Sequence, residues 1–266
     1  MTALIPTLLA AALYTGGTLY QVRCLQQRQT ANSALLRVIA LLALVAHAID
    51  LYSEMFTGHG LSFGFFHVSS LIAWLVIAVT LVFSLRAPVT SLLLVLFPLA
   101  LICELLAWLF PSHGAATIPG HSALLIHVLL SILAYGILTI AAFQAALLGL
   151  QNHQLRQRNP VRFNHMFPPL QTMEALLFQF LLCGEVLLTL SLVSGFVFLD
   201  NMLAQGVAHK TLLSCLAWVV FGILLWGRHV RGWRGNSAIR WTLCGFLLLM
   251  LAFFGSKLVY EFFLPL

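Results

Sequence analysis

Seven of the ten histidines lie in, or within about two turns of, the loops predicted on one side of a set of apolar segments. Imidazole is costly to place in hydrocarbon, and it is the commonest neutral nitrogen ligand for metals and haem iron. A one-sided set of histidines therefore predicts a ligand on that side. The seven are His47, His59, His67, His113, His121, His127 and His209, and the others are His153, His165 and His229.

His127 and His47 are the leading ligand candidates among these histidines. His127 lies about six residues, or ~9 Å, inside its apolar segment, and His47 lies at a similar depth in another. Two imidazoles at matched depth could ligate one haem iron from opposite faces. His67 and His121 are the next candidates, while the alternative for each intramembrane histidine is a structural hydrogen bond.

Four carboxylates fall in or beside the apolar segments. Asp50 follows His47 by three residues and Glu54 by seven, so on a continuous helix they share its face. Asp50 could orient an imidazole N–H or pair with a cation; the alternative is a pair of solvated charges at a helix end. Glu104 and Glu185 lie deeper, and ionisable groups in membrane spans are rare enough to be functional candidates.

A polar stripe follows His127 along its segment. Ser131 comes one turn after His127 and Tyr135 two turns after it, in an otherwise apolar helix. Such a stripe faces protein or a cofactor rather than lipid.

The composition predicts membrane-spanning helices, and these helices hold the candidate residues in place. The chain of 266 residues is 61% hydrophobic and 8% charged, where a soluble domain carries about 25% charged residues. Continuous apolar runs of ~20 residues predict helices that cross a bilayer. We expect an all-α polytopic membrane protein with one transmembrane domain over residues 1–266. The eight expected spans are Ala3–Tyr20, Ala34–Leu51, Phe63–Leu85, Val89–Phe110, Ser122–Leu150, Ala175–Leu199, Leu212–Trp226 and Ile239–Tyr260.

Charge predicts the orientation of these spans. With the N-terminus outside, all eleven arginines fall on one side, and only Lys210 and Lys257 fall on the other. The positive-inside rule makes the arginine side cytoplasmic, so both termini and the histidine-rich loops are expected on the periplasmic side. The net charge of +6 is then a topology signal, and no nucleic-acid partner is expected. The five cysteines form no CxxC motif, so no thiol exchange or covalent haem attachment is predicted.

Several segments together resemble the CcsA-like cytochrome c assembly family, over roughly residues 34–260. The helix with His127, Ser131 and Tyr135 is similar to the family's His-x-x-x-Ser-x-x-x-Tyr helix. Lys210, before Trp218, stands where the family carries a Pro-Lys-Glu-Thr-Trp motif. The surroundings of His47 look closest to the YpjD/HemX-like branch of inner membrane proteins. The remaining matching segments are Ala141–Leu147, Glu185–Gly195, Leu224–Gly227, Gly232–Gly235 and Phe254–Gly255.

The resemblance implies haem handling at the outer face of the membrane, with His127 matching an outer axial haem ligand. The family's tryptophan-rich haem loop should precede Lys210, but residues 200–209 contain no tryptophan. The family's second outer histidine near the C-terminus is also missing. We therefore predict haem binding without an enzymatic haem lyase activity, and no catalytic residue is assigned.

The sequence thus predicts a multi-pass protein of the bacterial inner membrane that binds or passes a b-type haem, retained or transient. The predicted ligands are His127 and His47, with His67 and His121 behind them. The expected partners are the lipid bilayer and other cytochrome c biogenesis or membrane proteins. Two alternatives stay open. One is a non-haem accessory or scaffold protein that stabilises a membrane partner. The other is a small-solute or proton-coupled transporter that uses Glu104 and Glu185.

Overall fold

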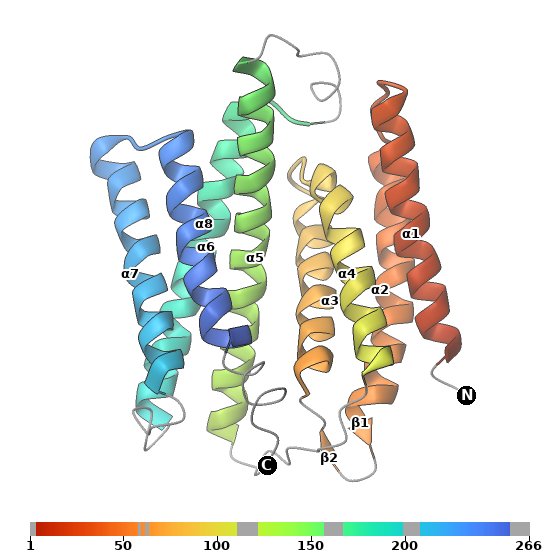
Figure 1. Cartoon of the computed structure of the whole chain (residues 1–266), viewed down its shortest axis with the longest axis horizontal. Coiled ribbons are helices and arrows are strands. Elements are labelled where there is room, and N and C mark those ends of the chain that lie inside the picture. Colours follow the sequence, from red (N-terminus) through yellow and green to blue (C-terminus); the bar gives the residue numbers. More distant parts are fainter. Residues whose placement is uncertain are drawn as a thin grey trace. The chain divides into compact units, whose positions relative to one another are not determined.

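The computed structural model describes residues 4–57, 60–61, 64–110, 122–156, 167–198 and 208–255. Within these residues the chain is almost entirely helical, which confirms the predicted all-α class (Figure 1). The helices are α1 (Leu4–Gln26), α2 (Ser33–Met55), α3 (Phe65–Phe83), η1 (Thr90–Leu92), α4 (Leu93–Leu109), α5 (Ser122–Arg156), α6 (Leu170–Phe198), α7 (Ala208–Arg231), α8 (Asn236–Met250) and η2 (Leu251–Gly255). One short hairpin after α2 pairs β1 (Phe56–Thr57) with β2 (Gly60–Leu61).

Seven of the helical segments in the described part of the chain are long and apolar enough to cross a membrane. They correspond to the predicted spans from the second to the eighth. Helix α1 is 23 residues long but is not among them. The count of eight spans and the placement of both termini outside therefore stay predictions.

The helices extend further than the apolar runs at several ends. Helix α5 continues six residues past the predicted end at Leu150, to Arg156. Helix α7 begins four residues before Leu212 and ends five residues after Trp226. Backbone hydrogen bonding continues where side chains become polar, so a hydropathy pattern marks the hydrocarbon-embedded part of a helix rather than its ends.

The chain divides into two compact units. Helices α1–α4 belong to the first and helices α5–α8 to the second, and each unit is described by itself. The predicted single transmembrane domain over residues 1–266 stays a prediction.

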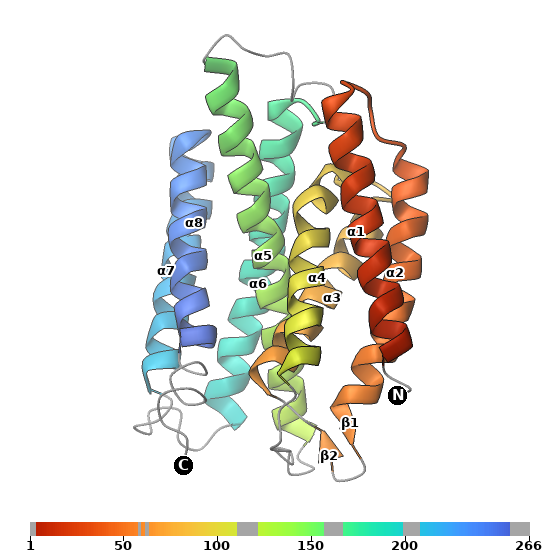
Figure 2. The same cartoon turned by 45° about the vertical axis from the view of Figure 1, so that its right-hand side comes forward.

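In the first unit, α1 packs against both α2 and α4, and α3 packs against α4 and α2 (Figure 2). Tyr14 and Phe97 are fully buried between α1 and α4, with ring centroids 5.6 Å apart. Gly17 makes this approach possible, since a Cβ at Gly17 would lie 2.5 Å from Phe97 Cε2. Trp74 Nε1 donates to Leu44 O at 2.9 Å and ties α3 to α2.

In the second unit, α5 packs mainly against α6, and α8 packs against α5 and α7. Gly184 of α6 allows a close approach to α5, because a Cβ there would lie 2.6 Å from Leu138 Cδ2 of α5. Gln144 Nε2 of α5 donates to Met173 O of α6 at 3.0 Å. The packed pair α5–α6 is the frame on which the His127 site is built.

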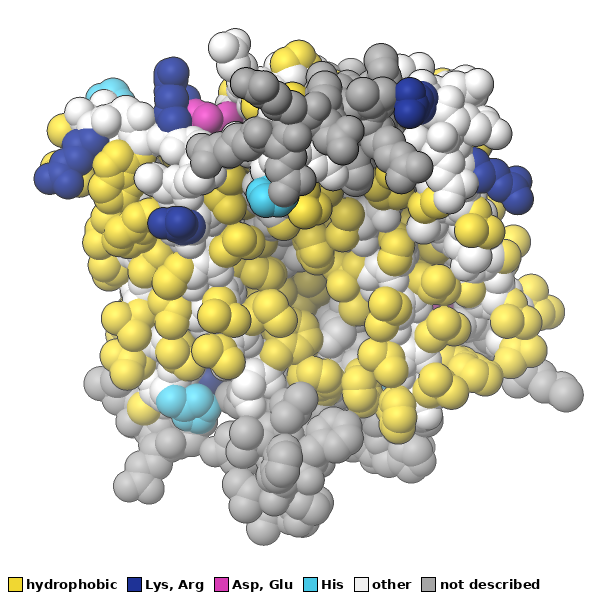
Figure 3. Space-filling view, turned by 45° about the horizontal axis from the view of Figure 1, so that its top comes forward, with side chains coloured by type: hydrophobic (Ala, Val, Ile, Leu, Met, Phe, Trp, Pro, Cys, Tyr) yellow, Lys and Arg dark blue, Asp and Glu magenta, His cyan; other side chains and the backbone are white. Residues whose placement is uncertain are grey.

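On the face drawn in Figure 3, hydrophobic side chains cover the sides of the helices, and Lys and Arg side chains lie mainly near helix ends. Exposed large residues such as Leu41, Val45 and Ile49 on α2 are more than half accessible. Lipid is the medium in which such a surface is stable.

Candidate functional site

His127 lies half-buried on α5 and faces α6. Its Nδ1 lies 3.0 Å from the backbone oxygen of Ser191 and 3.1 Å from Ser194 Oγ. A carbonyl oxygen can only accept, so this geometry requires the imidazole proton on Nδ1. No hydrogen-bond partner lies on Nε2 among the described residues. The ring is therefore held in one tautomer, with the Nε2 lone pair available to a ligand.

Two serines of α6 and one of α5 fix this arrangement. Ser194 Oγ donates to Ser191 O at 2.8 Å, so its lone pairs are free to accept from His127 Nδ1. Ser131 Oγ donates to His127 O at 2.7 Å and lies 2.7 Å from Ser191 Oγ. His127 and Ser131 of the polar stripe thus face α6, so this part of the stripe faces protein, as its position in an apolar helix predicts.

Tyr135 continues the stripe one turn further and is buried against aromatic rings. Its ring centroid lies 5.5 to 5.8 Å from those of Phe246, Phe253 and Phe254. Tyr135 therefore anchors α5 to α8 and η2, and supports the helix that carries His127.

His47 has a different environment in the first unit. It is fully buried on α2, with Nδ1 3.0 Å from Tyr14 Oη on α1 and Nε2 2.8 Å from Ser70 Oγ on α3. Both ring nitrogens are therefore engaged, and the residue joins three helices. Binding a metal through His47 would require one of these hydrogen bonds to break.

Asp50 and Glu54 continue the face of α2 that carries His47. Asp50 is buried and accepts a hydrogen bond from Thr7 Oγ1 on α1. Glu54 Oε2 lies 3.5 Å from Nε2 of His67, which is buried at the start of α3. His67 thus faces a carboxylate, and Asp50 binds a hydroxyl rather than an imidazole.

Glu104 of α4 is fully buried, and neither carboxyl oxygen has a hydrogen-bond partner in the part of the chain that the structure describes. Glu185 of α6 is also buried, and its Oε2 likewise lacks a partner among the described residues. These two glutamates belong to different units, so a shared path between them stays a prediction of the transporter alternative.

His47 and His127 also belong to different units, and their pairing on one haem stays a prediction. Lys210 lies half-buried in the first turn of α7, beside the exposed His209. His121 lies outside the described residues, as do His59, His113 and His165. The described residues contain no group of three or more His, Cys, Asp or Glu side chains placed to hold a metal ion.

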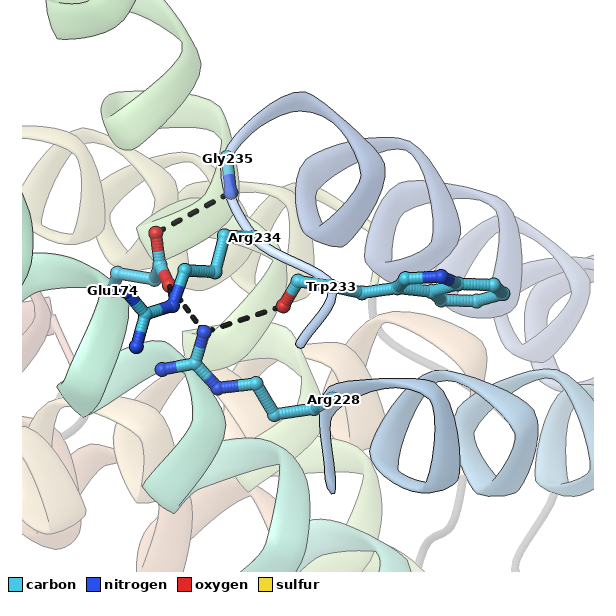
Figure 4. Close-up of polar contacts among 5 residues, drawn as sticks. All are labelled: Glu174, Arg228, Trp233, Arg234 and Gly235. Atoms are coloured by element: carbon cyan, nitrogen blue, oxygen red, sulfur yellow. Dashed lines mark hydrogen bonds and ion pairs between the residues drawn. The ribbon is translucent and has the colours of Figure 1, made fainter. Parts of the chain in front are cut away.

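A polar cluster at the arginine-rich end of the second unit joins the segment Gly232–Gly235 to Glu174, which the sequence analysis did not single out (Figure 4). Glu174 of α6 accepts from Arg228 Nη1 at 2.7 Å and from the backbone N–H of Gly235 at 3.3 Å. Arg228 also donates to Trp233 O at 3.2 Å, and Arg234 Nε lies 3.8 Å from Glu174. The cluster holds the α7–α8 turn against α6. One signal in the sequence could have indicated this cluster: Glu174 is a single acidic residue on the membrane side that carries several arginines.

These features define a class of protein, a polytopic α-helical membrane protein with polar side chains buried between its helices. A comparison with known families then identifies the branch of that class. Residues 33–264 match the sequence model described as Cytochrome C assembly protein, so the chain belongs to this family.

Curated relatives agree with this assignment. The Inner membrane protein YpjD of Escherichia coli is 31% identical over 256 residues, which cover 96% of this chain and 97% of that protein. Protein HemX of Brevibacillus brevis is 26% identical over 147 residues, 54% of each chain. No solved structure matches the chain significantly. The resemblance to the YpjD/HemX-like branch is thus confirmed, and the chain is a multi-pass inner membrane protein.

Proposed function

We propose that this member of the cytochrome c assembly family binds haem near its predicted periplasmic face, with His127 Nε2 as an axial ligand. The observation that carries the proposal is the state of the His127 ring. Its Nδ1 is held by Ser191 O and Ser194 Oγ, and its Nε2 has no hydrogen-bond partner among the described residues.

This arrangement fits what haem iron requires of a histidine. Metal-bound imidazoles almost always donate their other N–H to a carbonyl, carboxylate or water, which fixes the ring and raises its basicity. Ser191 O and Ser194 Oγ lie where such acceptors are needed. The half-buried position of His127 leaves part of the side chain accessible for contact with a cofactor. Haem, when bound, would supply the iron centre, and the α5–α6 pair would orient its ligand.

The second axial ligand is less constrained by the geometry. His47 would have to give up Tyr14 or Ser70, and His67 would have to leave Glu54. We therefore assign His127 the primary role and keep His47, His67 and His121 as candidate second ligands. A b-type haem held by one strong ligand can be retained or passed on, in keeping with the family's name.

Absorption spectroscopy of the protein purified in detergent with added haem tests the proposal. The wild type is expected to show a Soret band, and His127→Ala is expected to lose or shift it. Val128→Ala, a change of a neighbouring half-exposed residue, is the matched control. A wild type without a Soret band, or a band unchanged in His127→Ala, would refute the assignment.

A scaffold function is the second candidate, and the environment of His47 favours it. A histidine with both nitrogens bonded to side chains of two other helices acts as an interhelical connector. On this reading the chain stabilises a membrane partner without haem. Copurification of a membrane protein with wild type and with His127→Ala alike, and no haem in either, would favour it.

A further inference from the structure

A cavity lies between α5, α6 and the start of α8, at the arginine-rich end of the second unit. Its volume is about 390 Å³, within the ~300–1,000 Å³ range of small-molecule sites. Its polar lining consists of Asn152 of α5, Glu174 of α6, Arg234 of the turn between α7 and α8, and Asn236 and Ser237 of α8. All of these residues belong to the second unit. The cavity is therefore a polar recess at the predicted cytoplasmic surface of the membrane.

Below its polar rim the cavity has an apolar floor. Leu148 lies one helical turn before Asn152 on α5, and Ile239 lies about one turn after Asn236 on α8. Helix α5 ends at this side of the protein and α8 begins there, so both apolar side chains lie deeper toward the predicted hydrocarbon. Both are also buried. Such a recess suits an amphiphilic ligand, with a polar group at the rim and an apolar part beneath it.

The charge of the cavity is positive. Glu174 is the acidic residue among its described lining residues, and its Oε1 and Oε2 already accept from Arg228 Nη1 and from the N–H of Gly235 (Figure 4). Arg234 is held more loosely, because its Nε lies 3.8 Å from Glu174 Oε1 and its side chain is 71% exposed. Two guanidinium groups beside one carboxylate leave one net positive charge. The cavity therefore favours an anion, with Arg234 as the cation that is available to it.

Neutral hydrogen-bond donors accompany this charge. Asn152 Nδ2 donates to Asn236 Oδ1 at 2.8 Å, and the NH₂ group of Asn236 has no partner among the described residues. If both amides were turned over, the free NH₂ group would be that of Asn152 instead. The Ser237 hydroxyl also has no hydrogen-bond partner in the described part of the chain. A guanidinium, an amide and a hydroxyl together suit an anion with several acceptor oxygens, and a phosphate ester is such an anion.

We propose that this cavity is a binding site for a phosphate ester, with Arg234 as the residue that contacts the phosphate oxygens. The planar guanidinium presents paired N–H donors that match phosphate geometry. Two sources can supply the group at this surface: the headgroup of an anionic phospholipid in the cytoplasmic leaflet, or a soluble phosphate ester. The apolar floor at Leu148 and Ile239 favours the phospholipid, whose acyl chains continue toward the hydrocarbon. The site does not involve His127 or haem.

Native mass spectrometry of the full-length protein in detergent tests the proposal. The protein is titrated with phosphatidylglycerol and, separately, with phosphatidylcholine of the same acyl chains. Because phosphatidylcholine carries a compensating positive charge, it should bind more weakly to a positive cavity. We expect the wild type to bind one phosphatidylglycerol about tenfold more tightly than phosphatidylcholine, as for a hydrogen bond between charged groups.

Substitutions at the rim show whether this preference belongs to the cavity. Arg234→Gln should weaken phosphatidylglycerol binding by about tenfold. Arg240→Gln is the matched control, because Arg240 is an exposed arginine of α8 that does not line the cavity, and its effect should stay within about twofold. Asn236→Asp keeps an acceptor for Asn152 and replaces the free NH₂ group with a negative oxygen, so it should also abolish the preference. These two rim variants are independent, so the test does not rest on the folding of either one.

Soluble glycerol phosphate, added in excess, distinguishes the two sources. It carries the same phosphate ester without acyl chains. Displacement of phosphatidylglycerol from the wild type would assign the site to a soluble phosphate ester. Retention of the lipid would assign it to the membrane. Either result supports a phosphate site, provided that binding depends on Arg234.

Three results would overturn the proposal. One is equal affinity of the wild type for phosphatidylglycerol and phosphatidylcholine. Another is an equal loss in Arg234→Gln and Arg240→Gln, which would indicate diffuse attraction to a basic surface. The third is oleate binding as tightly as phosphatidylglycerol, which would identify a carboxylate rather than a phosphate as the ligand. His127→Ala should leave the lipid preference unchanged, so failure of this proposal is distinguishable from failure of the haem assignment.

Discussion

Ser194→Ala is the substitution that most directly probes how His127 is held. The change removes the Oγ that lies 3.1 Å from His127 Nδ1 and leaves the Ser191 carbonyl at 3.0 Å. The ring keeps its tautomer because the carbonyl still accepts its proton. It loses one of two contacts that set its orientation.

The expected loss of haem affinity follows from the number of acceptors that remain at His127 Nδ1. Removing an outer partner of a metal-binding histidine typically costs 10- to 100-fold in metal affinity. Since one of two acceptors remains, the lower end applies. We expect Ser194→Ala to weaken haem binding by about tenfold, or about 1.4 kcal/mol. His127→Ala should abolish haem binding through this axial position.

Haem titration followed at the Soret band measures this affinity in wild type and variant. Ser131→Ala is the matched control, because Ser131 bonds the backbone oxygen of His127 and Ser191 Oγ but not the imidazole. Its effect should stay below about twofold. Equal affinities for wild type and Ser194→Ala, or equal losses in Ser194→Ala and Ser131→Ala, would refute the idea that Nδ1 is the oriented side of the ring.

Three further predictions concern stability in detergent, each followed as a thermal midpoint. Tyr14→Phe removes the hydroxyl 3.0 Å from His47 and should cost about 1 kcal/mol without changing a Soret band; loss of the band would instead make His47 part of the haem site. Glu174→Gln weakens the 2.7 Å bond to Arg228 and should cost about 1–2 kcal/mol. The double variant with Arg228→Gln should lose less stability than the sum of the two single losses. A loss equal to that sum would show that the pair contributes nothing. Gly184→Leu should lower the midpoint far more than Gly16→Leu, because a Cβ meets Leu138 at 2.6 Å in the first case and nothing within 4 Å in the second; similar midpoints would mean that α5 and α6 are not tightly packed there.

Much of the fold could be predicted because lipid imposes one simple rule. Only helices satisfy their own backbone in hydrocarbon, so apolar runs of sufficient length had to be helices. The ends of α5 and α7 were missed because polar side chains do not stop a helix that has left the hydrocarbon. The hairpin at Phe56–Thr57 and Gly60–Leu61 was missed because two-residue strands leave no periodic pattern.

The candidate site was predictable in its residue types but not in its contacts. The spacing of His127, Ser131 and Tyr135 marked one face of α5, and the structure turns the first two toward α6. The partners Ser191 and Ser194 come from a helix about sixty residues later in the chain. The segment Glu185–Gly195 that contains them was singled out only by its resemblance to the family, and its contact with His127 was not predictable, because any polar residue of another helix could have met that face.

The contrast between His127 and His47 shows what decides the chemistry of a buried histidine. Both are histidines of apolar segments at a similar predicted depth, so their depth gives no reason to separate them. A backbone carbonyl opposite Nδ1 fixes the proton of His127 and leaves Nε2 as a free base. Hydroxyl groups can donate or accept, so Tyr14 and Ser70 satisfy both nitrogens of His47 whichever one carries the proton. The first environment leaves one ring nitrogen open, and the second closes a hydrogen-bond network. The acceptor type on the neighbouring helix, rather than the depth of the histidine, therefore decides whether a ring nitrogen stays open in these two histidines.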